Sequence, residues 1–466
     1  MKNGEIFGDT IDISDEGNTE RLIESQTGDA EDSELFDYLK KLESNPVDLN
    51  SASISELEAI PFLNAVISKK IIEYRTKYRK FNSISELKNV IEIDNDLYRE
   101  ITKFLIVKES KVDFRRDEFG RVERIVLSGN ISKFDFRKFD FKMRNRFTND
   151  LQPSRGYLYE IYRGMRPKIY NKLDLRYSSG NLIFNGGIVS EKDAGERKIF
   201  DFIGGYVEMK NIGIVNQVLL GDYTLEFGQG ITLWSSLAFS KGNDAVSAVK
   251  KNAGNINSYS SVNEVQFFRG IASKLNLGTS YGNFNLFGFF SDNYFDASSD
   301  SARGELSAFY YDGYHRTESE IRREKAAKEK LFGGRLSYEL GSARLGFTYY
   351  KSYFSESFTY KSLNKGYDFS GSRTNAMSVD YDFVFQNMNF FGEWSRSYTG
   401  AIGGVSAARI IFSSKKFGTD VVFLVRNYPM NFIMLHSYGF GEQSGNTQNE
   451  FGIYSGIKFK VPGLVT

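Results

Sequence analysis

Apolar and polar residues alternate along residues 377–385, with apolar side chains at every second position: Met377, Val379, Tyr381, Phe383 and Phe385. A period of two predicts a β-strand, because successive side chains of a strand point to opposite faces. Gln386 and Asn387 allow a tight reversal, and residues 388–397 return with one mostly apolar face. The apolar side of this predicted hairpin needs a cover, which is protein in a soluble sheet or lipid in an outer-membrane barrel.

Similar strand patterns recur through most of the chain, at residues 139–147, 173–177, 182–188, 206–209, 215–223, 268–277, 284–291, 335–340, 343–353, 407–412 and 419–428. Short reversals, such as residues 341–342, alternate with long polar connections, such as residues 292–330 and 429–449. That asymmetry is typical of outer-membrane barrels, whose short turns face the periplasm. We therefore predict a large antiparallel transmembrane β-barrel over residues 111–466.

A five-residue motif, Ser-Ile-Ser-Glu-Leu, occurs at residues 53–57 and again at residues 83–87. Serine followed three residues later by glutamate is a capping box, which predicts the start of a helix in each copy. Each short helix leads through a tight turn into a longer one with an apolar face, such as that of Ile67 and Ile71. The repeat predicts two helical hairpins that pack as a pair, in a small all-α module over residues 32–108.

Residues 1–31 form an acidic leader. The first 45 residues hold thirteen acidic and four basic side chains, and up to about residue 30 they show few apolar residues and no periodicity. This composition predicts disorder. The leader lacks the basic start and apolar core of a signal peptide. If the protein is exported, we therefore expect that the sequence given is that of the mature chain, or that it lacks its true amino end.

Residues 47–105 resemble the tandem helix-hairpin-helix module of competence-type DNA-receptor proteins. In that family each hairpin turn carries a glycine-hydrophobic-glycine motif, whose backbone amides approach a DNA phosphate at a helix start. Here Phe62, Leu63 and Asn64 occupy the first turn, while Glu92 and Asp94 replace the glycines of the second. Side chains crowd the first turn, and carboxylates repel phosphate at the second.

The helix after the first turn is strongly basic and has two interpretations. Its bases are a candidate DNA-phosphate surface or a solvated helix face: Lys69, Lys70, Arg75, Lys77, Arg79 and Lys80. Because both turns depart from the DNA-binding pattern, the sequence favours a docking or scaffold module over a DNA-binding one.

Three segments of the predicted barrel, residues 191–196, 221–230 and 264–270, are similar to those of a poorly characterised family of Gram-negative envelope proteins. The resemblance runs from about Leu35 to the end and implies a helix-hairpin-helix module followed by an outer-membrane β-barrel. It implies architecture and location more than mechanism.

Candidate lumenal residues come from two sources. Alternation along residues 139–147 places three bases on one side of a strand, where they would line the lumen and favour anions: Lys142, Arg144 and Arg146. The envelope-family segments supply polar residues for an internal network, or simply for turns, bulges and one lumenal ion pair: Asp193, Glu196, Asp222, Gln229, Glu264 and Arg269.

Composition argues against catalysis. The chain has no cysteine and only two histidines, His315 and His436, both placed in predicted loops. No nucleophile elbow, paired-histidine zinc motif or phosphate loop accompanies them. We therefore expect neither an enzyme nor a metal or cofactor site. No apolar run is long enough for a transmembrane helix.

The sequence thus predicts an α+β protein of the outer membrane, with its barrel in lipid and its helical module in the periplasm. The expected role is transport or envelope assembly, with the module docking a periplasmic protein. A DNA-uptake receptor is the alternative, and a soluble all-β binding protein is a third. Because the chain stops just after an apparent strand, we also expect further strands beyond Thr466, so that the barrel shown is incomplete.

Overall fold

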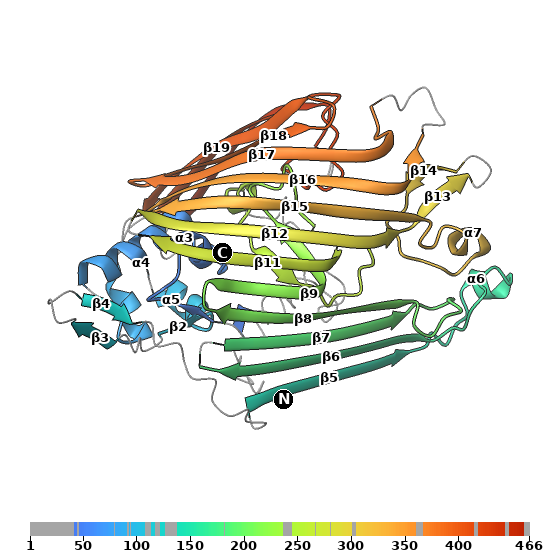
Figure 1. The fold of residues 1–466 in the computed structure, drawn as a ribbon, viewed down its shortest axis with the longest axis horizontal. Coiled ribbons are helices and arrows are strands. Elements are labelled where there is room, and N and C mark those ends of the chain that lie inside the picture. The colour runs from blue at the N-terminus through green and yellow to red at the C-terminus, as the bar shows by residue number, and fades with distance from the viewer. Residues whose placement is uncertain are drawn as a thin grey trace, which may run out of the picture.

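The computed structural model describes residues 42–43, 46–78, 80–90, 93, 95–107, 113–116, 122–125, 138–180, 182–235, 245–265, 267–279, 281–300, 304–359, 367–413, 418–442 and 447–460. Within these ranges it contains a small helical module followed by a large β-barrel (Figure 1). No helix in this part of the chain is both long and apolar enough to cross a membrane.

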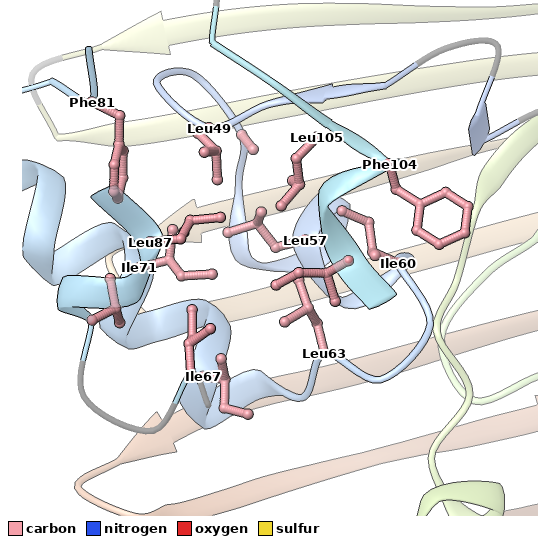
Figure 2. Close-up of a cluster of buried hydrophobic side chains, with 14 residues drawn as sticks. Leu49, Leu57, Ile60, Leu63, Ile67, Ile71, Phe81, Leu87, Phe104 and Leu105 are labelled. Carbon is pink, nitrogen blue, oxygen red and sulfur yellow. The ribbon is translucent and has the colours of Figure 1, made fainter. Parts of the chain in front are cut away.

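The helical module has the predicted order of two hairpins. Its helices are α3 (Ile54–Glu58), α4 (Ala65–Tyr78), the 3₁₀ helix η2 (Ile84–Asn89) and α5 (Asn95–Thr102), and its ends pair as the short parallel strands β1 (Val47–Asp48) and β2 (Leu105–Ile106). The repeat places apolar side chains of all four helices in one core, which includes Leu57, Ile71, Leu87 and Ile101 (Figure 2).

The two copies of the motif cap their helices differently. In the first copy Ser53 and Glu56 form the predicted capping box at the start of α3. In the second, the Ser83 hydroxyl makes no cap bond, and Glu86 accepts a hydrogen bond from the backbone of Asn82 instead. The predicted second capping box was wrong because this segment is wound as a tighter 3₁₀ helix, in which the donor to Glu86 is the amide of Asn82 and not that of Ser83.

The barrel wall is antiparallel. Its strands are β5 (Phe139–Thr148), β6 (Lys168–Ser179), β7 (Leu182–Lys192), β8 (Phe202–Ile212), β9 (Val215–Glu226), β11 (Phe268–Thr279), β12 (Gly282–Phe295), β15 (Ala327–Leu340), β16 (Ala343–Phe358), β17 (Gly371–Phe385), β18 (Met388–Ser397), β19 (Ile402–Ser413), β20 (Gly418–Tyr428) and β21 (Glu450–Lys460). Paired registers join successive wall strands from β5 to β21.

Three short strands extend this sheet. β10 (Asn255–Ser258) pairs with β9, and β13 (Ala297–Asp300) and β14 (Glu305–Phe309) form a hairpin, with β14 also pairing with β16. A separate hairpin, β3 (Asp113–Arg116) and β4 (Val122–Ile125), lies between the module and the barrel in sequence.

The two ends of the barrel differ as predicted. Tight reversals such as β15–β16 and β17–β18 lie at one end, and longer connections, which carry the short helices α6 (Arg155–Leu158) and α7 (Glu318–Ile321), lie at the other. Figure 1 shows the helical module at the short-turn end. The module therefore sits at the opposite end of the barrel from α6, α7, β13 and β14.

The hairpin of β17 and β18 confirms the predicted alternation. Val379 and Trp394 are paired across the two strands and both expose their side chains outward, whereas their neighbours Ser378, Asp380 and Glu393 are buried. A row of exposed apolar side chains continues around the wall through directly paired residues: Leu286, Leu336, Phe347, Val379 and Trp394. An apolar outer band with a polar interior is the pattern of a lipid-embedded barrel.

The barrel interior is packed with segments of the same chain. Phe227 and Leu233, which follow β9, pack in one cluster with inward residues of β9, β11, β12, β15, β16 and β17. Ile231 and Val249 pack in a second cluster with inward residues of β18, β19 and β20. The segment between β9 and β10 thus contacts both sides of the wall and forms a core inside it.

Candidate functional site

The first hairpin turn of the module is occupied by its own side chains. Asn64 accepts hydrogen bonds at Oδ1 from the backbone amides of Val66 and Ile67, each at 3.0 Å. Phe62 adopts a left-handed backbone, with φ of 72°, and exposes its ring, while Leu63 is buried in the module core. The amides that would face a phosphate at the start of α4 are therefore already satisfied.

The basic residues of α4 are divided between structural and exposed positions. Lys69 donates to the carbonyl of Val384 in β17 at 3.4 Å, and Arg75 donates to the carbonyl of Leu49 at 2.8 Å. Lys70 is half-buried, and Lys77 and Lys80 are exposed. Arg79 and the second-turn residues Glu92 and Asp94 lie outside the described residues. These bases do not share one face.

The module is bound to the barrel by an apolar contact beside that turn. Ala65 and Val66, in the first turn of α4, are both buried against Val384 of β17 and Ile411 of β19. Both barrel residues lie close to the short-turn end of their strands. The start of α4 is therefore covered by the barrel mouth.

A buried ionic contact continues this interface into the lumen. The Nζ of Lys250 lies 2.7 Å from Oε1 of Glu58, at the end of α3, and 2.8 Å from Oδ2 of Asp382 on the inward face of β17. Asn252 donates to the backbone carbonyl of Glu58 at 2.7 Å, and Arg344 reaches Asp382 at 3.4 Å. Burial raises the pKa of the Glu58 carboxyl even beside Lys250.

A second buried carboxylate anchors the internal segment to the wall. Glu393 of β18 accepts hydrogen bonds from three backbone amides of one turn, those of Gln229, Ile231 and Thr232, at 2.7, 3.0 and 3.2 Å. Gly228 permits this approach, since its φ is 58° and an added Cβ would lie 2.5 Å from Oε2 of Glu393. The turn after Gly228 is thus wrapped around a carboxylate of the barrel wall.

The candidate lumenal residues fall into separate sets. Arg269 of β11 pairs with Asp222 of β9, with its Nε 2.6 Å from Oδ1. Gln229 exchanges hydrogen bonds with the backbone of Lys251. On β5, Lys142 is exposed and pairs with Asp140, Arg144 is partly buried, and Arg146 lies over the Tyr170 ring.

Asp193, Glu196 and Glu264 belong instead to the long-connection end. Asp193 pairs with Lys168 at 2.9 Å, and its backbone amide donates to Glu196 at 2.7 Å. Burial raises the pKa of Glu196 to about 7 and that of Glu264 to about 8.

Both histidines lie in connections between strands, as predicted, but His315 is buried and His436 is partly buried. His315 contacts Asp201 through Nδ1 and Asp296 through Nε2, the latter at 2.7 Å. Burial opposes its charge, but these hydrogen bonds prevail and raise the pKa of His315 to about 10. His436 lies within the barrel interior, with Nε2 2.8 Å from Oε1 of Glu329. Neither partner set could be found from sequence, because Asp201 is 114 residues from His315 and Glu329 is 107 residues from His436.

Sequence reasoning missed Glu58 and Lys250 as functional residues, and it also missed that Glu393 accepts hydrogen bonds from the internal segment. Asp382 and Glu393 carried a signal, since both stand on the polar face of the predicted hairpin. Glu58 carried a weaker one, as an acid between the core residues Leu57 and Ile60.

Comparison with known proteins supports the assignment of the helical module. A helix-hairpin-helix motif model matches residues 43–106, and a search of curated proteins by sequence found no match. The chain therefore combines a helix-hairpin-helix module with an outer-membrane-type antiparallel β-barrel.

Solved structures similar to this chain include porins and other outer-membrane proteins. They include OmpF of Salmonella typhi in complex with daunomycin, with 9% identity, a TM-score of 0.29 and coverage of 69% of this chain and 96% of that one. An anion-selective porin from Comamonas acidovorans has 12% identity, a TM-score of 0.27 and coverage of 64% and 90%. OmpT of Vibrio cholerae has 9% identity, a TM-score of 0.25 and coverage of 68% and 97%. At such TM-scores the barrel assignment rests on this chain's own strand pairings.

Proposed function

We propose that this protein is an outer-membrane transport barrel whose helix-hairpin-helix module acts as a periplasmic plug. The observation that carries the proposal is the buried ion pair of Glu58 and Lys250, which joins the module to the segment that fills the lumen. A module linked in this way to the interior of the barrel is placed to control passage through it.

The orientation of the plug follows from the turns. Short turns of outer-membrane barrels face the periplasm, and the module contacts β17 and β19 near their short-turn ends. The apolar row that includes Leu336 and Val379 supports a lipid-facing wall. Together these observations support a module in the periplasm and a barrel in the outer membrane.

Passage through the barrel requires two contacts to change. Release of α4 would separate Ala65 and Val66 from Val384 and Ile411. Release of α3 would part Glu58 from Lys250, whose second partner, Asp382, remains on the wall. Because the internal segment holds Lys250, movement of the module would also pull on the core that fills the lumen.

The free face of the module supports a role for a periplasmic protein in this release. Lys77 and Tyr78 at the end of α4 are exposed, as is Phe62 in the first turn. Aromatic rings beside basic side chains are frequent anchors of protein interfaces. We propose that a periplasmic partner binds this face, residues 32–108 being the docking part and 111–466 the membrane part.

Uptake of DNA is the competing function and has less support. Asn64 occupies the amides at the start of α4, and Arg75 is committed to the carbonyl of Leu49. The remaining exposed bases would give only salt-sensitive, sequence-independent contacts.

The plug proposal can be tested with cysteine pairs, because the chain has no cysteine of its own. A Val66→Cys, Val384→Cys double variant would link α4 to β17 on oxidation. The measurement is the conductance of planar lipid bilayers that contain the protein, with potassium chloride as the electrolyte. We expect the oxidised protein to stay closed, and the reduced protein to show openings that increase further in Val66→Asp, which places a carboxylate in the apolar contact.

Each single-cysteine variant serves as the control for oxidation itself. Equal conductance of the oxidised and reduced double variant, or a closed barrel in Val66→Asp, would reject the plug.

A further inference from the structure

A histidine and two carboxylates meet inside the long connections at the end of the barrel opposite the module. Glu196 and Asp201 come from the β7–β8 connection and His315 from the β12–β15 connection, and all three residues are buried. One ligand atom from each lies within 4.8 Å of the other two. Imidazole nitrogen and carboxylate oxygen are the donors that zinc and similar divalent metals take in proteins.

The ring nitrogen of His315 that would not bind the metal, Nε2, contacts a carboxylate, as is usual for metal-bound histidines. Its Nδ1 faces Asp201, while its Nε2 lies 2.7 Å from Oδ2 of Asp296. A metal-bound histidine usually donates its other ring N–H to a carboxylate, which orients the ring and strengthens the ligand. Asp296 is itself positioned by the backbone amide of Lys325, at 2.8 Å from Oδ1.

The nearby lysines direct their hydrogen bonds and ion pairs to other groups, although Lys192 is near enough to Glu196 and Asp201 to interact electrostatically. Lys168 pairs with Glu191 and Asp193, and Lys198 pairs with Glu324. Lys192 directs its ammonium group to three backbone carbonyls, including those of Met165 and Asp193.

The cluster therefore holds more carboxylates than basic side chains. In the part of the chain that the structure describes, His315 is the basic side chain paired with Asp201 and Asp296. One imidazole thus stands among several buried carboxylates, Glu264 from the β9–β11 connection being near enough to interact electrostatically. A divalent cation would neutralise this excess.

We propose that Glu196, Asp201 and His315 bind a divalent transition metal of the zinc class, with Asp296 orienting the histidine. His315 would bind through Nδ1 as neutral imidazole and keep its Nε2–H on Asp296. Because its ligands come from both connections, the metal would link the β7–β8 connection to the β12–β15 connection at this end of the barrel. This site is independent of the plug at the other end.

The test uses the full-length protein in detergent, stripped with a chelator and titrated with zinc chloride by calorimetry. We expect one equivalent of zinc per chain, and X-ray absorption that shows a single imidazole ligand. His315→Gln should abolish binding, whereas His436→Gln, which removes the other histidine, should leave it unchanged. Asp296→Asn should weaken binding by roughly 10–100-fold.

Limited trypsin digestion gives a second measurement if His315→Gln folds poorly. Zinc should slow cleavage after Arg197 and Arg322 in the wild-type protein but not in Glu196→Gln. A wild-type protein that binds no zinc overturns the site. So does binding in Glu196→Gln or His315→Gln that equals the wild type, which would mark an adventitious surface ion.

Discussion

Glu58 and Lys250 are 192 positions apart in the chain and form an ion pair, with Nζ of the lysine 2.7 Å from Oε1 and 2.9 Å from Oε2 of the glutamate. Both side chains are buried. The two residues differ in their other partners. Lys250 also contacts Asp382, whereas burial disfavours the charged form of Glu58 and Lys250 favours it. Loss of the lysine and loss of the glutamate should therefore have different consequences.

Lys250→Met should release the module, and Glu58→Gln should not. The first change leaves the buried Glu58 carboxylate without its paired cation, which costs about 3–5 kcal/mol, while Asp382 keeps Arg344. The second leaves Lys250 paired with Asp382 and removes a charge that burial already disfavours. Thiol labelling of a buried Val66→Cys reports release, and Lys250→Met should speed it by roughly 10²–10⁴-fold. Equal rates for the two variants would contradict this asymmetry.

The raised pKa of Glu58 makes docking pH-dependent. A carboxyl with a higher pKa in the folded state contributes stability below its unfolded pKa, and this contribution is lost as pH rises through the folded value. Labelling of Val66→Cys, corrected for thiol ionisation with an exposed cysteine, should thus become faster as pH rises above the ordinary glutamate range. In Glu58→Gln this pH dependence should shrink, and an unchanged profile there would assign it to another group.

Leu336→Arg should impair membrane assembly of the barrel. Leu336 points outward from β15 within the apolar row, and arginine on the lipid face costs ~2–4 kcal/mol near the bilayer midplane. Leu151→Arg is the matched control, because Leu151 is 94% exposed in the β5–β6 connection. Heat-modifiable migration of folded barrel in electrophoresis measures assembly. Similar yields of both variants would argue against a lipid-facing band.

Glu393→Leu should loosen the segment inside the barrel. Its removal leaves the amides of Gln229, Ile231 and Thr232 without an acceptor, at about 1–3 kcal/mol for each buried group. Glu393→Gln keeps an acceptor oxygen of nearly the same shape and should cost less. Thermal unfolding in detergent gives the order wild type, glutamine, leucine. A leucine variant as stable as the glutamine variant would show that the segment is held by packing alone.

DNA binding by the full-length protein should be weaker than the non-specific range of about 10⁻⁴–10⁻⁶ M at physiological salt. Asn64→Gly should leave it weak, because the amides of Val66 and Ile67 that glycine frees lie at the start of α4, which the barrel covers. Fluorescence anisotropy with a duplex probe measures both proteins. Submicromolar, salt-dependent binding by the unchanged protein, lost when Lys69 and Lys70 are neutralised, would favour the DNA receptor.

Local patterns in the sequence were sufficient to predict the main elements. The alternation from Met377 to Phe385 assigns each side chain to a face, because a strand has a period of two, and Gln386 with Asn387 marks the turn. The repeated Ser-Ile-Ser-Glu-Leu motif likewise predicted two helical hairpins. Both signals are carried by residues close together in the chain, so they can be read without knowing the fold.

The candidate site was decided by tertiary structure. Nothing near Glu58 or Lys250 in sequence indicates that they pair, since that contact exists only when the segment after β9 enters the barrel and the module covers its mouth. His315 shows the same limit, since its environment depends on the meeting of two connections more than 100 residues apart. The sequence by itself determined which residues form strands and helices and which strand faces are apolar. Only the closed arrangement of wall, internal segment and module decided which buried charges meet, because a buried charge is stabilised by whatever partner the fold brings within a few ångströms.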